Sequence, residues 1–450
     1  MPEASPSTHD DVPAFTVLRG LFAACDESPP LHVVQIRNRA LDLLTALDGG
    51  DYDLLLPANE HPEFLRRLMR LAQSAHVSFT LDQTNPAKRR ITLHVPTRTN
   101  DIVLEIWTHL EVRDSDKSTA RAITWSSLAA LVTPSDSGWR LPQPVETLYY
   151  LSHLATRRKS LSSPEVQRRL EHYRAATQAP EIQVLIENLT TTKNISAAAT
   201  AANRQLVNRG ILKPVHGFFA HCASWYAAEA EHRLRQRRRT HTHGGVFAFT
   251  GPDGVGKTTV INGLCADLLS RAVPYRFKSL FRHNPVYNIL YAVRYKQEAQ
   301  AYGGKLEKNI FDELQSPALF RIARLGHPWL KFRAWLGSYR CCDRYYHELL
   351  FADLRRPGAQ PHLRDSWQDL AKKIPLPAWH IQLDATDAVI LARKQELSPS
   401  ALACYREGLF AIHLAIETPY YTYLNTGAAL AEIRTILRRA GSPLGLRFRP

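Results

Sequence analysis

The segment Val246 to Ser270, VFAFTGPDGVGKTTVINGLCADLLS, constrains the fold of this 450-residue chain more than any other segment. It begins with β-branched and aromatic residues, passes through a glycine-rich loop and ends in an amphipathic helical pattern. The loop, Gly251 to Thr258, has the spacing G-x-x-x-x-G-K-T. Its glycines permit a tight backbone path between the strand and the helix. The segment therefore predicts an α/β fold in which a strand leads through this loop into a helix.

The same loop predicts a site for phosphate groups. Its backbone N–H groups face an anion near a helix N-terminus. Lys257 adds positive charge on the β- and γ-phosphates, and the Thr258 hydroxyl is placed to ligate Mg²⁺. ATP and Mg²⁺ are therefore the expected cofactors. The predicted nucleotide-binding residues are Gly251, Pro252, Asp253, Gly254, Val255, Gly256, Lys257, Thr258 and Thr259.

The segment Ser338 to Arg356 carries a second signal, a short strand that ends in Asp343-Arg344-Tyr345 and is followed by a helix. An acid at the end of a strand beside the loop is placed to hold Mg²⁺ or its water ligands. The planar guanidinium of Arg344 suits an acceptor phosphate. An ATP-driven motor would end this strand in Asp-Glu, and that Glu is absent. The pattern favours phosphoryl transfer, and a buried structural ion pair of Asp343 with Arg344 stays open as the alternative.

The residues GPDGVGKTT together with Asp343-Arg344-Tyr345 resemble the thymidylate kinase family of P-loop nucleoside monophosphate kinases. The resemblance covers residues 244–450 and implies a parallel sheet flanked by helices, with a small-molecule phosphate acceptor. It implies that Asp253 lies near a sugar hydroxyl of the acceptor. It also implies that Arg282, which follows an expected strand at Tyr275–Leu280, grips the acceptor's phosphate.

The resemblance extends to a basic lid. The segment Leu376 to Ser398 is similar to the family's fourth strand, its following helix and the lid, with Arg393 and Lys394 able to close over the transferring phosphate. A solvated helix face is the alternative for these two residues. YYTYLN and the terminal GAALAEIRTILRRAG resemble the last strand and helix of the family. The predicted catalytic residues are Lys257, Asp343, Arg344 and Arg393, and the predicted acceptor-binding residues are Asp253, Arg282 and Arg344.

Two departures from the family pattern concern the acceptor. Asn284 to Gly337 is a long, helix-rich and aromatic stretch where the family is more compact, and the usual Arg-Glu-Pro-Gly signature is absent. The expected acceptor is therefore a nucleoside monophosphate-like compound or another sugar or nucleotide metabolite, and dTMP is not singled out.

The N-terminal half contains an acidic pattern. In GGDYDLLLP, Asp51 and Asp53 lie on the same side of an extended segment because side chains alternate along a strand. Glu105, in DIVLEIW on a later strand, could join them, and three converging acids would hold Mg²⁺ for nucleotidyl transfer. The pattern resembles the nucleotidyltransferase superfamily, which implies a small α/β domain over residues 31–143. A solvated Asp-Gly turn is the alternative.

The remaining segments complete the predicted organisation. Residues 1–30 are expected to be a flexible N-terminus, and residues 144–243 a helical region and connector without strands. The connector segment, Gly217 to Arg239, opens with aromatic residues and closes with RLRQRRR. Such a pattern predicts a connector helix. The more specific alternative is a helix that makes weak contact with a membrane surface.

The net charge of +15 favours an anionic partner. Because the arginines are spread along the whole chain, a small phosphorylated compound is a better candidate than nucleic acid. The cysteines form no C-x-x-C pair, and no apolar run of about 20 residues appears, so a cytoplasmic protein without a transmembrane segment is expected.

Three functions stay open: a kinase, a nucleotidyltransferase acting through the acidic site, and an ATP-dependent switch protein. The sequence predicts no oligomeric state.

Overall fold

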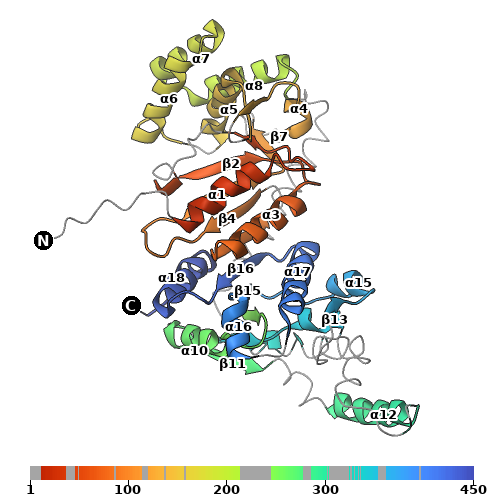
Figure 1. The fold of residues 1–450 in the computed structure, drawn as a ribbon. Helices are drawn as coiled ribbons and strands as arrows, with labels where there is room; N and C mark the ends of the chain where they lie inside the picture. The colour runs from red at the N-terminus through yellow and green to blue at the C-terminus, as the bar shows by residue number, and fades with distance from the viewer. Residues whose placement is uncertain are drawn as a thin grey trace, which may run out of the picture. The chain divides into compact units, whose positions relative to one another are not determined.

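In the computed structural model, the chain folds into two compact units (Figure 1). The first unit comprises Met1–Leu71, Asn85–Ile91 and Ile102–Arg237. The second unit comprises Ala72–Thr84, Thr92–Asp101 and Arg238–Pro450. The structure describes residues 12–36, 46–48, 50–85, 88–113, 120–135, 138–156, 159–212, 245–276, 285–301, 303, 324, 327–328, 330–332, 334, 336–352, 361–394 and 397–449.

The second unit is built on a mostly parallel sheet with the strand order β11-β12-β10-β15-β16-β3. Five of these strands are parallel, and β3 pairs antiparallel with β16. The α/β fold expected for this part of the chain is confirmed, with one antiparallel strand added. In sequence order the strands are β3 (Phe79–Asn85), β10 (Val246–Thr250), β11 (Ala272–Arg276), β12 (Tyr339–Asp343), β15 (Trp379–Asp384) and β16 (Tyr420–Asn425).

Helices cover both faces of this sheet. Alternate residues of β10 enter two different hydrophobic clusters, because neighbouring side chains on a strand point to opposite faces. One cluster includes apolar residues of α10 and α18, and the other includes residues of α15 and α17. Parallel strands need such crossover helices, which bury both faces. The helices are α10 (Lys257–Asp267), α12 (Pro285–Ala301), α15 (Trp367–Ala371), α16 (Asp387–Arg393), α17 (Pro399–Ile416) and α18 (Leu430–Gly441).

The first unit contains a mixed sheet with the strand order β4-β5-β2-β1-β9-β8 and a separate β6-β7 pair. Its β2 and β5 are parallel, and their register places Asp53 opposite Glu105. The strands are β1 (Val34–Gln35), β2 (Asp51–Leu55), β4 (Lys88–Leu93), β5 (Ile102–Trp107), β6 (His109–Arg113), β7 (Ala120–Thr124), β8 (Thr133–Ser135) and β9 (Gly138–Arg140).

A helical region follows these strands. Helices α5 to α8 contribute apolar residues to one core together with β5, β6 and β7. The helices of the first unit are α1 (Pro13–Ala24), α3 (His61–Ser74), α4 (Trp125–Leu128), α5 (Gln143–Thr156), α6 (Pro164–Ala176), α7 (Pro180–Thr192) and α8 (Ile195–Asn208). The connector segment, residues 217–239, lies outside the described residues.

The structure corrects three expectations. The supposed flexible N-terminus contains α1, because Phe15, Leu18 and Phe22 recur at helical spacing and are buried. Residues 72–84 and 92–101, which include the last residues of α3 and of β4, belong to the second unit and not to the N-terminal domain, since β3 pairs with β16. The helix expected after Asp343 is a short 3-10 helix, η1 (Tyr346–Leu350), followed by β13 (Phe351–Ala352), which pairs with β14 (His362–Leu363). Four of the five η1 residues are buried, so the segment has no solvent-facing stripe.

The strand expected at Tyr275–Leu280 begins earlier, as β11, and is described only as far as Arg276. Arg282 therefore lies outside the described residues. Within the described ranges, no helix has both the length and the apolar character required to span a membrane.

Candidate functional site

The glycine-rich loop connects β10 to α10 through a backbone that only glycine adopts readily. Gly251 has φ 142° and Gly256, which caps α10, has φ 93°. A Cβ atom on Gly251 would collide with the carbonyl oxygen of Leu383, at the end of β15. The loop thus lies against the neighbouring strand end, and its first glycine is required for that close approach.

The side chain of Lys257 folds back into this loop. Its Nζ donates to the carbonyl oxygens of Gly251 at 2.8 Å and Pro252 at 2.9 Å, and lies 3.3 Å from Oδ1 of Asp253. The residue is only 7% exposed. Burial lowers the pKa of Lys257, while nearby carboxylates, Glu348 first, oppose the shift. The ammonium group is therefore held inside the loop by groups that a phosphate anion can replace.

Asp253 is the carboxylate on which the cations of the loop converge. Besides Lys257, it pairs with Arg344, and its Oδ2 accepts from Nζ of Lys394 at 3.2 Å. Burial raises its pKa, but the charges of Arg344, Lys257 and Lys394 outweigh burial and hold the pKa well below its usual range. The carboxylate thus stays ionised and neutralises cations that would otherwise repel one another.

Arg344 follows β12 and holds its guanidinium between two carboxylates. Nη1 donates to Oε2 of Glu348 at 2.5 Å, and Nη2 donates to Asp253. Its φ of 73° is uncommon for a residue other than glycine, and its backbone N–H donates to the carbonyl of Phe249 at 2.9 Å. Tyr405 supports the arrangement by donating to the other Glu348 oxygen at 3.4 Å. The guanidinium fork is therefore aimed at the loop before any ligand arrives.

Asp343, the last residue of β12, lies opposite Phe249 of β10 in the sheet. Burial raises its pKa, against the charges of Lys257 and Arg344. Its Oδ1 is buried and has no hydrogen-bond partner among the described residues. The Thr258 hydroxyl belongs to an exposed residue in the first turn of α10. An unpaired carboxylate oxygen and a hydroxyl are donors that fit Mg²⁺ or its bound water.

The basic residues at the end of α16 also reach the loop. Arg393 Nη1 donates to the carbonyl of Gly254 at 3.3 Å, and Lys394 makes the ion pair with Asp253 described above. Both side chains remain exposed on their outer side. The structure thus brings together Asp253, Lys257, Asp343, Arg344 and Arg393 of the predicted site, and Lys394 with them.

Two side chains that hold parts of this site were not predicted from the sequence. Glu348 orients Arg344, and the only sequence signal for it is the spacing of four residues. Arg406 on α17 clamps the turn between β15 and α16 by donating to Asp384 Oδ1 at 2.8 Å and Asp387 Oδ1 at 2.6 Å. No local pattern marks Arg406, because its partners lie some twenty residues away along the chain.

The predicted acidic cluster of the first unit also assembles. Ligand oxygens of Asp51, Asp53 and Glu105 lie within 4.8 Å of one another. Lys88 already pairs with Glu105, and its Nζ lies 4.9 Å from the centroid of the Trp107 ring. Burial raises the pKa of Glu105, partly offset by Lys88. The donor oxygens fit a divalent cation, but a lysine ammonium currently supplies the positive charge.

Comparison with solved structures finds similarity at a distance only. No protein-family model matches the chain, and no curated protein matches it. A solved thymidylate kinase from Candida albicans is 12% identical and has a TM-score of 0.31, covering 46% of this chain and 99% of its own. At this identity and TM-score, the match identifies neither a family nor an activity.

Proposed function

We propose that the second unit is an ATP-dependent phosphotransferase that moves the γ-phosphate of ATP to a small-molecule acceptor. The observation that carries the proposal is the cluster of charges around Asp253, where Lys257, Arg344 and Lys394 all contact one carboxylate beside the loop. Phosphoryl transfer depends mainly on positioning and on neutralising phosphate charge. A preformed group of cations at a helix N-terminus supplies both.

Each residue has a role in this reaction. The loop N–H groups and Lys257 bind the β- and γ-phosphates, so that phosphate oxygens replace the carbonyls and Asp253 as partners of the ammonium. Thr258 and Asp343 would hold Mg²⁺, which neutralises phosphate charge when bound. Arg344, fixed by Glu348, binds the acceptor's anionic group. Arg393 lies over the loop and neutralises charge on the transferring phosphate.

The acceptor is proposed to be a nucleoside monophosphate-like compound or another sugar or nucleotide metabolite. Support for an anionic acceptor comes from Arg344, whose guanidinium donates to two different carboxylates, Glu348 through Nη1 and Asp253 through Nη2, and is equally suited to phosphate oxygens. The acceptor's anionic group would replace Asp253 as the partner of Nη2, while Glu348 continues to hold Nη1.

A transfer screen tests the proposal. The full-length chain is incubated with γ-labelled ATP and, in separate reactions, nucleoside monophosphates, nucleosides and sugar phosphates. We expect labelling of one acceptor class, and a loss of about 100-fold or more in Lys257→Ala, since a single charged contact to transition-state oxygens is worth about that much. The matched control is Lys372→Ala, an exposed lysine outside the site. ATP hydrolysis without labelling of any acceptor would contradict the proposal.

The acidic cluster supports a second candidate, a nucleotidyltransferase in the first unit. The favouring observation is the convergence of Asp51, Asp53 and Glu105, since clustered carboxylates hold the metal ions of such reactions. This activity predicts pyrophosphate release from a nucleoside triphosphate that survives Lys257→Ala and is lost in Asp53→Asn. Release that instead disappears with Lys257→Ala would assign the activity to the loop.

A further inference from the structure

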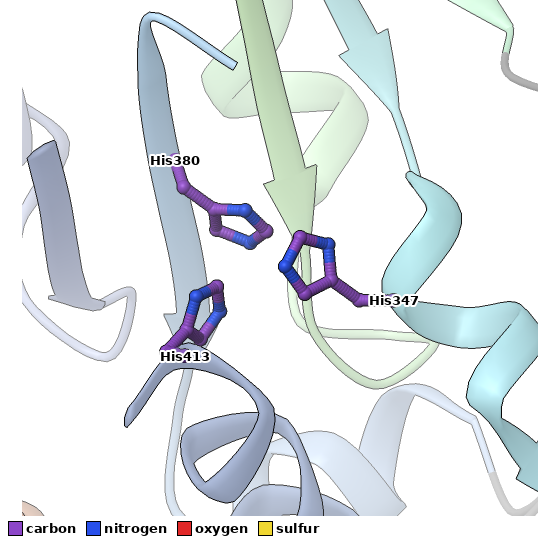
Figure 2. Close-up of side chains that lie close together, drawn as sticks. All are labelled: His347, His380 and His413. Carbon is purple, nitrogen blue, oxygen red and sulfur yellow. The ribbon is translucent and has the colours of Figure 1, made fainter. Parts of the chain in front are cut away.

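Three buried histidines of the second unit converge on one point (Figure 2). His347 comes from η1, His380 from β15 and His413 from α17. The centroid of the His380 ring lies 4.3 Å from that of His347 and 4.1 Å from that of His413, and the third separation is 4.7 Å. Each ring offers a nitrogen within 4.8 Å of the other two. Their exposed fractions are at most 2%.

Hydrogen bonds account for only part of this cluster. His380 Nε2 lies 2.8 Å from the Thr250 hydroxyl, and His413 Nδ1 lies 2.9 Å from the Thr418 hydroxyl. The remaining nitrogens, His380 Nδ1, His413 Nε2 and both nitrogens of His347, have no partner among the described residues. Buried polar atoms are almost always paired, so unpaired nitrogens gathered from three rings call for an occupant.

The protonation state suits a metal ligand. Burial lowers the pKa of all three imidazoles, that of His347 to about 3. Each neutral ring keeps a lone pair on one nitrogen. A ring that donates to Thr250 or Thr418 through one nitrogen keeps the lone pair on its other nitrogen. Such outer hydrogen bonds fix the tautomer and the orientation of metal-bound histidines.

We propose that His347, His380 and His413 form a binding site for a divalent first-row transition metal ion, with Zn²⁺ as its representative. Three imidazoles favour ions such as Zn²⁺, Co²⁺ and Ni²⁺ over Mg²⁺ or Ca²⁺, which prefer oxygen. Bonds of about 2.0–2.1 Å from the ion to each nitrogen require ring movements on the order of 1 Å from the present positions.

The site lies directly behind the phosphate loop. Thr250, which contacts His380, is the residue before Gly251, and His347 precedes the Glu348 that holds Arg344. A bound ion would tie η1, β15 and α17 together and stabilise the base of the loop. This structural role goes beyond the proposed phosphotransferase and does not depend on it.

Metal content provides the test. The full-length chain, free of any histidine tag, is stripped with a chelator and dialysed against Zn²⁺ or Co²⁺. We expect about one ion per chain, and visible absorption bands of low-coordinate Co²⁺ that contains nitrogen ligands. His347→Gln and His413→Gln are expected to lose the ion. The matched control is His327→Gln, which removes another buried histidine of the same unit. This variant is expected to keep the ion.

A milder variant covers the case in which a cluster variant does not fold. Thr418→Val removes only the hydroxyl beside His413 and is expected to weaken Zn²⁺ binding by about 10-fold. A folded wild-type chain that takes up no ion, or a folded His347→Gln chain that binds Zn²⁺ as tightly as wild type, would overturn the proposal.

Discussion

The phosphate loop of the second unit and the acidic cluster of the first unit both depend on ion pairs, but the majority charge is positive in the loop and negative in the cluster. In the loop, Lys257, Arg344 and Lys394 surround one carboxylate, Asp253. In the acidic cluster, the carboxylates of Asp51, Asp53 and Glu105 lie close together, and the ammonium of Lys88 pairs with Glu105. The Asp253 carboxylate occupies a position that suits a bound anion, and the Lys88 ammonium occupies a position that suits a bound cation. The loop is therefore suited to an anion and the acidic cluster to a cation.

The largest expected effect comes from the backbone of the loop, which the acidic cluster does not share. In Gly251→Ala, the new Cβ meets the Leu383 carbonyl and the backbone is held at φ 142°, so we expect a loss of stability on the order of 2–4 kcal/mol and of ATP binding. Gly263→Ala on α10 is the control, because its added Cβ would meet no atom within 4 Å apart from its own helix backbone, and it should stabilise the helix by about 1 kcal/mol. Chemical denaturation measures both.

Removing one partner from the loop cluster comes next. Glu348→Gln takes the negative charge from Arg344 without changing the shape of the side chain, and its oxygen lies 2.5 Å from the guanidinium. We expect a loss of about 10-fold or more in phosphate transfer, with ATP affinity unchanged, because Glu348 positions the group that binds the acceptor. Equal losses in transfer and in ATP affinity would show that Glu348 supports the loop itself.

Substitution of Lys88, the positive charge of the acidic cluster, is expected to have a smaller effect than the substitutions in the loop. Lys88→Gln leaves Glu105, which lies beside the two aspartates, without its ammonium partner, so we expect a destabilisation of about 1–3 kcal/mol. Mg²⁺ or Mn²⁺ should restore stability, since a cation can occupy the vacated position. Arg66→Gln, which breaks the exposed pair with Glu63, is the control and should show neither effect. Thermal melts with and without metal distinguish the two variants.

The smallest effect is a difference in pH dependence. The folded pKa of Asp253 lies below its ordinary value of 3.8, so its contribution to stability is present above that value and is lost as the pH falls toward the folded pKa. The folded pKa of Glu105 lies above 4.5, so stability falls as the pH rises from 4.5 through the folded pKa.

These opposite slopes can be separated by substitution. Asp253→Asn should remove a loss of stability at acidic pH, whereas Glu105→Gln should remove a loss that develops as the pH rises. Denaturation of each variant and of wild type over pH 3–7 measures the two differences. Slopes of the same sign would contradict the charge assignment of the two sites.

The sequence predicted patterns of contiguous residues better than contacts between residues that are far apart in the chain. The strand, loop and helix around Lys257 are contiguous, so the spacing of the residues was sufficient. Strand alternation predicted that Asp51 and Asp53 share one side of their strand, whereas Glu105 was expected only as a residue that could join them. The register of β2 with β5 places Glu105 opposite Asp53. The pairing of β3 with β16 was missed, because Leu81 and Tyr421 are partners that no local periodicity connects.

The histidine cluster was missed for a related reason. His347, His380 and His413 are separated by about thirty residues each and share no metal-ligand spacing. Only the parallel packing of β10 and β15, with η1 and α17 on the same face, brings them together. Glu348 and Arg406 likewise act on residues whose positions become apparent only in the folded chain.

Calorimetric titration of the full-length chain with ATP and Mg²⁺ tests the central claim, that the cations around Asp253 form a site for nucleotide phosphates. Wild type and Lys372→Ala should bind ATP with equal affinity. Lys257→Ala should bind ATP about 10-fold more weakly or worse, because the phosphates lose their contact with the buried ammonium. An ATP affinity that Lys257→Ala leaves unchanged would contradict the account.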